Sequence, residues 1–152
     1  MRKSFTAAML AGLMTPLCCQ AELGGQATTT PAISKSIKAA VAVTEKQSSG
    51  YSIAETKPES GGSIKEYVNA DGIVFAVTWK TPVLPNLPSL LGQQYFSAFK
   101  AEAASKPHAG RGPVRINQSD LVIFSGGRLR AFVGKAYVPS LLPVGFDINA
   151  IQ

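Results

Sequence analysis

The stretch that decides the fold is residues 63–80, SIKEYVNADGIVFAVTWK, which has the pattern of a β-hairpin. Asp71-Gly72 stands between two runs in which apolar and polar residues alternate. This dipeptide favours a tight turn because it accepts the positive φ angles that such a turn needs. A two-residue turn here predicts the cross-strand pairs Val68–Phe75, Glu66–Val77 and Ile64–Trp79.

The two faces of this hairpin differ in polarity. One is apolar, with Glu66 as its only charge, and the other is mixed. A slip of one residue would turn the aromatic side chains to water, so the register is well specified. The predicted apolar face carries Ile64, Val68, Ile73, Phe75, Val77 and Trp79. The predicted mixed face carries Lys65, Tyr67, Asn69, Val74, Ala76 and Thr78.

A third strand and a helix adjoin the hairpin. Residues 51–57 alternate in the same way and predict a three-stranded antiparallel meander. After a proline-rich crossover, the apolar residues of 87–105 recur at helical spacing, which predicts a helix that covers the sheet. Gly92 interrupts this helix at a cost of about 1 kcal/mol relative to alanine, which suggests that another segment lies close to it.

The rest of the chain predicts three more strands, at 114–118, 121–125 and 128–138. Gly126-Gly127 is interpreted as the turn of a second hairpin, which sets Arg130 beside Ile123. Gly134 predicts a bulge in the last strand. The predicted fold class is therefore α+β, an antiparallel sheet of about six strands with one main helix on one face. Whether the two groups of strands join in a single sheet is left open.

The first 21 residues have the pattern of a secretory signal peptide. Arg2 and Lys3 precede an apolar run over 5–17, and Cys19-Gln20-Ala21 is a small-x-small cleavage site. We expect a signal peptide at 1–21, a weakly structured segment at 22–50 and a single domain at 51–152, located in the periplasm or secreted. The alternative is a lipoprotein anchored through Cys18 or Cys19.

Charge and hydropathy restrict the possible partners. The net charge of +6 becomes +4 when cleavage removes Arg2 and Lys3, because 13 Lys and Arg then face 9 Asp and Glu. This excess is spread along the chain and is compatible with anionic envelope polymers or with a role in solubility. It forms no basic-aromatic patch for nucleic acid. No segment after the signal has the roughly 20 apolar residues of a membrane span.

The sequence lacks the motifs of common catalytic and cofactor sites. His108 is the only histidine, and no metal-ligand spacing accompanies it. Both cysteines lie in the predicted signal peptide, and the glycine pairs match no phosphate-binding loop. We therefore expect no metal and no cofactor.

Four residues are candidates for ligand binding: Glu66, Tyr67, Trp79 and Arg130. Glu66 on the apolar face and Arg130 on the second hairpin would form a carboxylate–guanidinium pair that orients a ligand, although such pairs are commonly structural. Tyr67 and Trp79 would line a groove for a glycan or an apolar ligand, although aromatic residues in such positions usually belong to the core. Hydrolysis by paired carboxylates would require Glu66 together with Glu55.

A family resemblance covers the whole chain after the predicted signal peptide. It rests on Leu23-Gly24-Gly25, Tyr51, Glu55-Thr56, Glu66-Tyr67-Val68, the stretch 71–79, Leu84-Pro85-Asn86-Leu87, Leu90-Leu91-Gly92, Tyr95-Phe96, the stretch 126–132, the stretch 134–137 and Leu142-Pro143. In these segments the chain resembles a proteobacterial family of small exported proteins known as domain of unknown function 2844. Asn86 departs from the aspartate expected there. The resemblance implies an exported single-domain protein and no particular activity.

Two functions are compatible with these observations. The favoured interpretation is a non-enzymatic binding or accessory module for a cell-envelope component or a secreted partner. The alternative is a carboxylate-dependent hydrolase or lyase that acts on an envelope polymer through Glu66.

Overall fold

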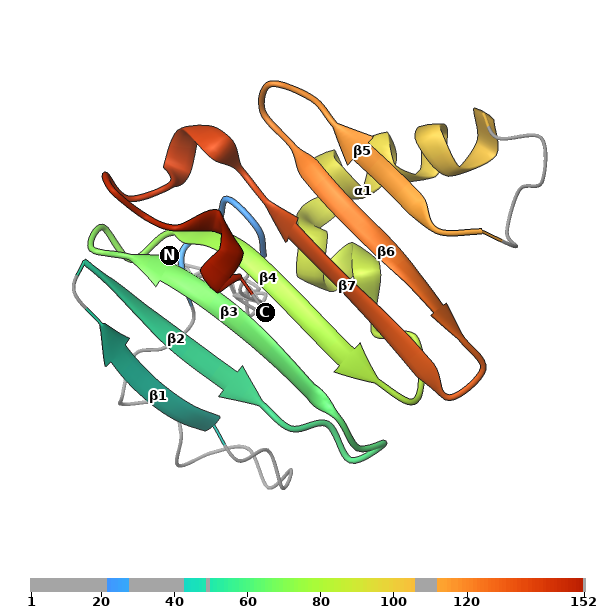
Figure 1. The fold of residues 1–152 in the computed structure, drawn as a ribbon, viewed down its shortest axis with the longest axis horizontal. Coiled ribbons are helices and arrows are strands. Elements are labelled where there is room, and N and C mark those ends of the chain that lie inside the picture. Colours follow the sequence, from blue (N-terminus) through green and yellow to red (C-terminus); the bar gives the residue numbers. More distant parts are fainter. Residues whose placement is uncertain (1–21, 28–42, 49, 106–111, 152) are drawn as a thin grey trace, which may run out of the picture.

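The computed structural model describes residues 22–27, 43–48, 50–105 and 112–151. These residues form one antiparallel sheet with the strand order β1-β2-β3-β4-β7-β6-β5, and a long helix lies across one face of it (Figure 1). The elements are β1 (Val43–Ser48), β2 (Tyr51–Thr56), β3 (Ser63–Asn69), β4 (Val74–Thr81), α1 (Leu87–Ser105), β5 (Val114–Asn117), β6 (Val122–Arg128) and β7 (Ala131–Tyr137), followed by the short 3-10 helices η1 (Pro139–Leu141) and η2 (Ile148–Ala150).

The predicted α+β class is confirmed, and the bounds of α1 are those predicted. Antiparallel pairing of β4 with β7 joins the two groups of strands, which the sequence left open, into one sheet. The sheet also contains one strand more than predicted. This strand, β1, pairs with β2 and lies inside the range 22–50 that was expected to be weakly structured.

In the first hairpin, the strands pair as predicted only on the side of a bulge that lies away from the turn. Its loop contains three residues rather than two, because Asn69 and Ile73 flank it, with Gly72 at a φ of 77°. A bulge in β4 then inserts one extra residue, so the pairs Glu66–Val77 and Ile64–Trp79 are as predicted. Val68 pairs with Val74, however, and the prediction that it faces Phe75 was wrong.

The second hairpin turns at a different place from the one predicted. Arg128 pairs with Ala131, so the turn consists of Leu129 and Arg130, and Gly126-Gly127 lies within β6. Ile123 consequently pairs with Ala136, and the prediction that it lies beside Arg130 was wrong. The predicted bulge at Gly134 was also wrong, because the pairing of β7 with both neighbours runs through this residue without a shift.

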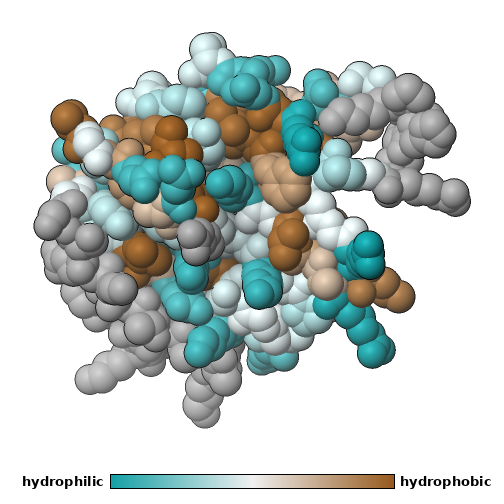
Figure 2. Space-filling view, in the orientation of Figure 1, coloured by the Kyte–Doolittle hydropathy of each residue, from teal (hydrophilic) through white to brown (hydrophobic). Residues whose placement is uncertain are grey.

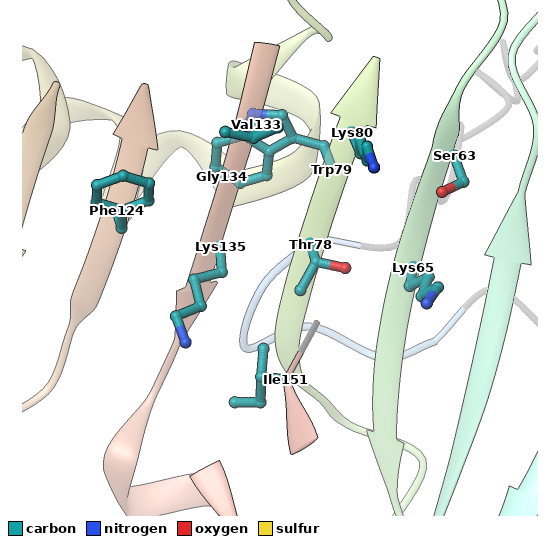
Figure 3. Close-up of a pocket in the computed structure, with 10 residues that line it drawn as sticks. All are labelled: Ser63, Lys65, Thr78, Trp79, Lys80, Phe124, Val133, Gly134, Lys135 and Ile151. Atoms are coloured by element: carbon teal, nitrogen blue, oxygen red, sulfur yellow. The ribbon is translucent and has the colours of Figure 1, made fainter. Parts of the chain in front are cut away.

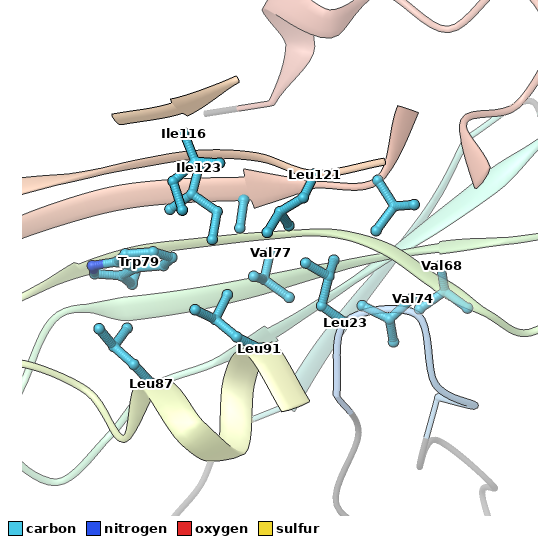
Figure 4. Close-up of a cluster of buried hydrophobic side chains, with 12 residues drawn as sticks. Leu23, Val68, Val74, Val77, Trp79, Leu87, Leu91, Ile116, Leu121 and Ile123 are labelled. Carbon is cyan, nitrogen blue, oxygen red and sulfur yellow. The ribbon is translucent and has the colours of Figure 1, made fainter. Parts of the chain in front are cut away.

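The larger core lies between α1 and the sheet (Figure 4). Leu87 and Leu91 of α1 contact side chains from the central strands, and the indole of Trp79 lies among them. Leu23, which precedes the sheet in the chain, also lies in this core and is only 3% exposed. The buried residues of this cluster are Leu23, Val68, Val74, Val77, Trp79, Leu87, Leu91, Ile116, Leu121, Ile123, Ala136 and Val138.

A smaller core lies on the opposite face, under the C-terminal segment 139–151. The bulge in β4 turns Phe75 to this side, where its ring meets that of Phe146 edge-on at 5.0 Å between centroids. Tyr51 contacts the same ring of Phe146 at 5.0 Å. Ile151 closes the cluster and is 2% exposed. The segment covers only part of this face, as Figure 1 shows.

Several sequence-based predictions lie outside the described residues. They concern the signal peptide at 1–21, its two cysteines and the loop histidine His108. Among the described residues, no helix has the length and apolarity needed to cross a membrane.

Candidate functional site

The four candidate residues do not come together in the fold. Glu66 and Trp79 lie on the face of the sheet that α1 covers, since their pairing partners Val77 and Ile64 contact the larger core. Tyr67 lies on the opposite face, and Arg130 is at the tip of the β6–β7 turn. A carboxylate–guanidinium pair between Glu66 and Arg130 is therefore not formed.

Glu66 is a carboxylate in apolar surroundings. It lies on β3 between Ala54 of β2 and Val77 of β4, and neither neighbouring side chain can donate a hydrogen bond to it. Partial burial raises the pKa of Glu66 from 4.5 to about 7, because the charged form loses part of its hydration. The side chain is thus largely protonated below neutral pH.

Glu66 has no second carboxylate beside it from the neighbouring strand. Glu55 pairs with Lys65, whereas Glu66 pairs with Ala54. Because successive residues of a strand point to opposite faces, the two carboxylates lie on opposite sides of the sheet. The paired-carboxylate arrangement is therefore not present between these two residues.

The two aromatic candidates are core residues. Tyr67 and Trp79 are each 2% exposed. The Tyr67 hydroxyl donates a hydrogen bond to the carbonyl of Ala150 at 3.4 Å, which ties β3 to the C-terminal segment. The Trp79 Nε1 is buried and has no hydrogen-bond partner among the residues that the structure describes.

A row of side chains that the sequence did not predict crosses the second face of the sheet, where the C-terminal segment leaves this face open. Cross-strand pairing aligns one residue from each of six neighbouring strands, from β2 to β5. At a strand spacing of about 4.8 Å, the row is about 24 Å long. It consists of Glu55, Lys65, Thr78, Lys135, Phe124 and Arg115. Together with Ser63, Lys80 and Val133 of the next row, we call these residues the open face.

The open face is basic and contains one aromatic ring. Lys65, Lys135 and Arg115 occupy every second strand of the row, at intervals of about 10 Å. The Arg115 guanidinium lies over the Phe124 ring, 5.3 Å from its centroid. Such stacking fixes an arginine while leaving its hydrogen-bond donors available. Lys80 adds an exposed cation beside the row.

A shallow hollow of about 300 Å³ lies on the open face (Figure 3). Figure 3 shows Lys135, Thr78 and Lys65 side by side on three strands, with Ile151 of the C-terminal segment beside them. In Figure 2, hydrophilic residues are spread over this side of the molecule, next to hydrophobic residues of the C-terminal segment. The hollow thus combines three lysine side chains with apolar side chains, among them Phe124, Val133 and Ile151.

Within the described part of the chain, no group of three or more metal-ligating side chains forms a metal site. A comparison with protein families matches residues 19–151 to a family described as a protein of unknown function, DUF2844. The chain belongs to this family. The family resemblance seen in the sequence is therefore confirmed, and the family adds no activity. Comparisons with curated proteins and with solved structures gave no match.

Proposed function

We propose that the chain is an exported binding module whose ligand surface is the open face, and that the ligand is an extended anionic polymer of the cell envelope. Export rests on the signal-peptide pattern of residues 1–21. The observation that carries the proposal is the cross-strand row, in which Lys65, Lys135 and Arg115 recur about every 10 Å along a line. A linear polymer with repeated negative charges meets several cations at once on such a surface.

The chemistry of the row favours binding over catalysis. Lysine and arginine side chains attract carboxylate, sulfate or phosphate groups, and the Phe124 ring offers an apolar surface to a sugar ring or an acyl group. The hydrolase alternative depends on Glu66, which lies on the other face of the sheet, away from this surface. Its raised pKa suits a general acid, and the test of Glu66 argued below bears on that role as well.

Charge reversal on the open face tests the proposal. Lys135→Glu and Lys80→Glu are each expected to weaken binding to dextran sulfate by about tenfold at low salt, because each replaces an attraction of about 1 kcal/mol by a repulsion. Binding of the wild-type chain is also expected to weaken as salt is raised. Titration calorimetry or elution from a dextran sulfate column measures both effects.

Lys100→Glu is the matched control, since it makes the same change of charge at an exposed position on α1, on the other side of the sheet. An equal loss in all three variants would mean that only net charge matters and would refute the open face as the site. Binding of uncharged dextran with the same affinity would contradict an electrostatic ligand. Tighter binding to polyglutamate than to dextran sulfate would instead indicate an acidic protein partner.

A further inference from the structure

Residues 22–27, ELGGQA, lie against the rest of the fold as a turn followed by an antiparallel bridge. The Gly25 N–H donates to the Glu22 carbonyl at 2.8 Å and closes the turn, and Gln26 then pairs with Ile73. The Gly24 N–H donates to the Val74 carbonyl at 2.8 Å, and the Val74 N–H donates to the Gly25 carbonyl at 3.0 Å. The Ala27 N–H donates to the Gly72 carbonyl at 2.8 Å. The segment therefore occupies the edge of β4 at the point where β7 has ended, since the Val138 N–H already reaches the Phe75 carbonyl.

The segment also reaches the helix. Gly92 has a φ of 73° and breaks α1 into two parts, and the Leu23 N–H donates to the Leu90 carbonyl at 3.0 Å. A Cβ on Gly92 would lie 2.8 Å from a carboxylate oxygen of Glu22. The close approach suspected at Gly92 is thus made by this segment. The break in α1 and the absence of a side chain at Gly92 both serve to receive it.

The surroundings of the segment restrict which residue fits at two of its positions, 23 and 24. The Leu23 side chain is buried between α1 and the sheet (Figure 4). Gly24 has a φ of 79°, and a Cβ there would lie 3.3 Å from the Tyr95 ring. The next side chain, Gln26, is exposed. Recognition by backbone hydrogen bonds at a strand edge, with a pocket for one side chain, is the mode by which many domains bind extended peptides.

We infer that the groove between the edge of β4 and the break in α1 is a peptide-binding site for a Leu-Gly-Gly turn followed by a short extended stretch, and that the chain's own residues 22–27 fill it as an exchangeable ligand. This site is separate from the open face and does not depend on the function proposed above. Its ligand is selected by a buried leucine and by a glycine in the left-handed region directly after it.

In the test, the chain is cleaved after it has folded, so that the segment is no longer covalently attached to the rest of the protein. A recognition sequence for a site-specific protease replaces residues 31–37 of the full chain, and the folded protein is then cleaved. We expect the N-terminal fragment to co-elute with the body in gel filtration. A labelled peptide ELGGQATTT is expected to replace it after mild urea treatment and dilution, as measured by fluorescence anisotropy and mass spectrometry.

Variant peptides provide the specificity controls. The Leu23→Ala and Gly24→Ala peptides are expected to bind at least tenfold more weakly, whereas the Gln26→Ala peptide is expected to bind like the wild type. Loss of the fragment without rebinding of excess peptide would overturn the inference, whether the body stays folded by circular dichroism or unfolds. Equal binding of all four peptides would overturn the assigned specificity.

Discussion

Gly134→Ala is expected to lower the free energy of unfolding by about 3 kcal/mol, a large loss for the addition of a single methyl group. Gly134 lies on β7 opposite Trp79, and the indole ring lies across the space that a side chain at Gly134 would fill. An added Cβ would overlap this ring and would also lie 2.7 Å from the Phe124 carbonyl oxygen. Neither group can move easily, because the ring is buried and the carbonyl belongs to the sheet. Urea denaturation measures the effect.

Gly112→Ala is the control, because a Cβ there meets no atom of the described residues within 4 Å, and its effect should stay within about 0.5 kcal/mol. Trp79→Leu removes the ring that causes the overlap. The double variant Gly134→Ala/Trp79→Leu should therefore lose less stability than the sum of the two single variants. A loss below about 1 kcal/mol for Gly134→Ala would contradict the packing of the indole over β7.

This glycine illustrates what the sequence could predict and what it could not. A glycine inside a strand indicates either a bulge or the close approach of another group, and the two have the same local pattern. The choice depends on Trp79, which is far away in sequence and meets Gly134 only because β4 pairs with β7. Local alternation of apolar residues predicted both strands, but it contains no information about that pairing.

The exact turns of the two hairpins also could not be predicted from local sequence. In the first, a loop longer by one residue and a bulge in β4 compensate each other, so Glu66 and Ile64 have their predicted partners although Phe75 does not. In the second, Arg130 adopts a φ of 65°, a region that glycine prefers. A rule that looks for glycine therefore chose Gly126-Gly127 instead.

The open face was missed for a related reason. Lys65, Lys135 and Arg115 each lie on the polar side of a predicted strand. The alternation of polar and apolar residues therefore predicts that these side chains face away from the core. Their alignment in one row depends on the strand order, which unites β3, β7 and β5 through non-local pairs. The placement of Glu66 on the covered face, in contrast, needed only the register of one hairpin.

Glu66→Gln is expected to stabilise the fold at pH 8 and to have little effect at pH 4. The folded-state pKa of about 7 lies above the value of 4.5 for a free glutamate. Between these two values the folded chain keeps a proton that the unfolded chain has lost, so the stability of the wild type falls as the pH rises from 4.5 to 7 and is then level. Glutamine is neutral throughout and avoids this loss. A shift of this size corresponds to about 3 kcal/mol, and because Glu66 is only partly buried we expect a gain at pH 8 on the order of 2 kcal/mol. Urea denaturation at both pH values measures it.

Glu59→Gln is the matched control, because it removes one carboxylate from an exposed position in the loop between β2 and β3. Any effect of net charge appears in both variants, and their difference isolates the burial of Glu66. A variant that is less stable than the wild type at pH 8 would mean that the charged carboxylate has a stabilising partner.

If Glu66→Gln shows the expected gain and still binds dextran sulfate like the wild type, Glu66 contributes a buried proton and no ligand contact. Loss of a polymer-cleaving activity in this well-folded variant would support the hydrolase alternative instead, because only that function requires the carboxylate to give up its proton.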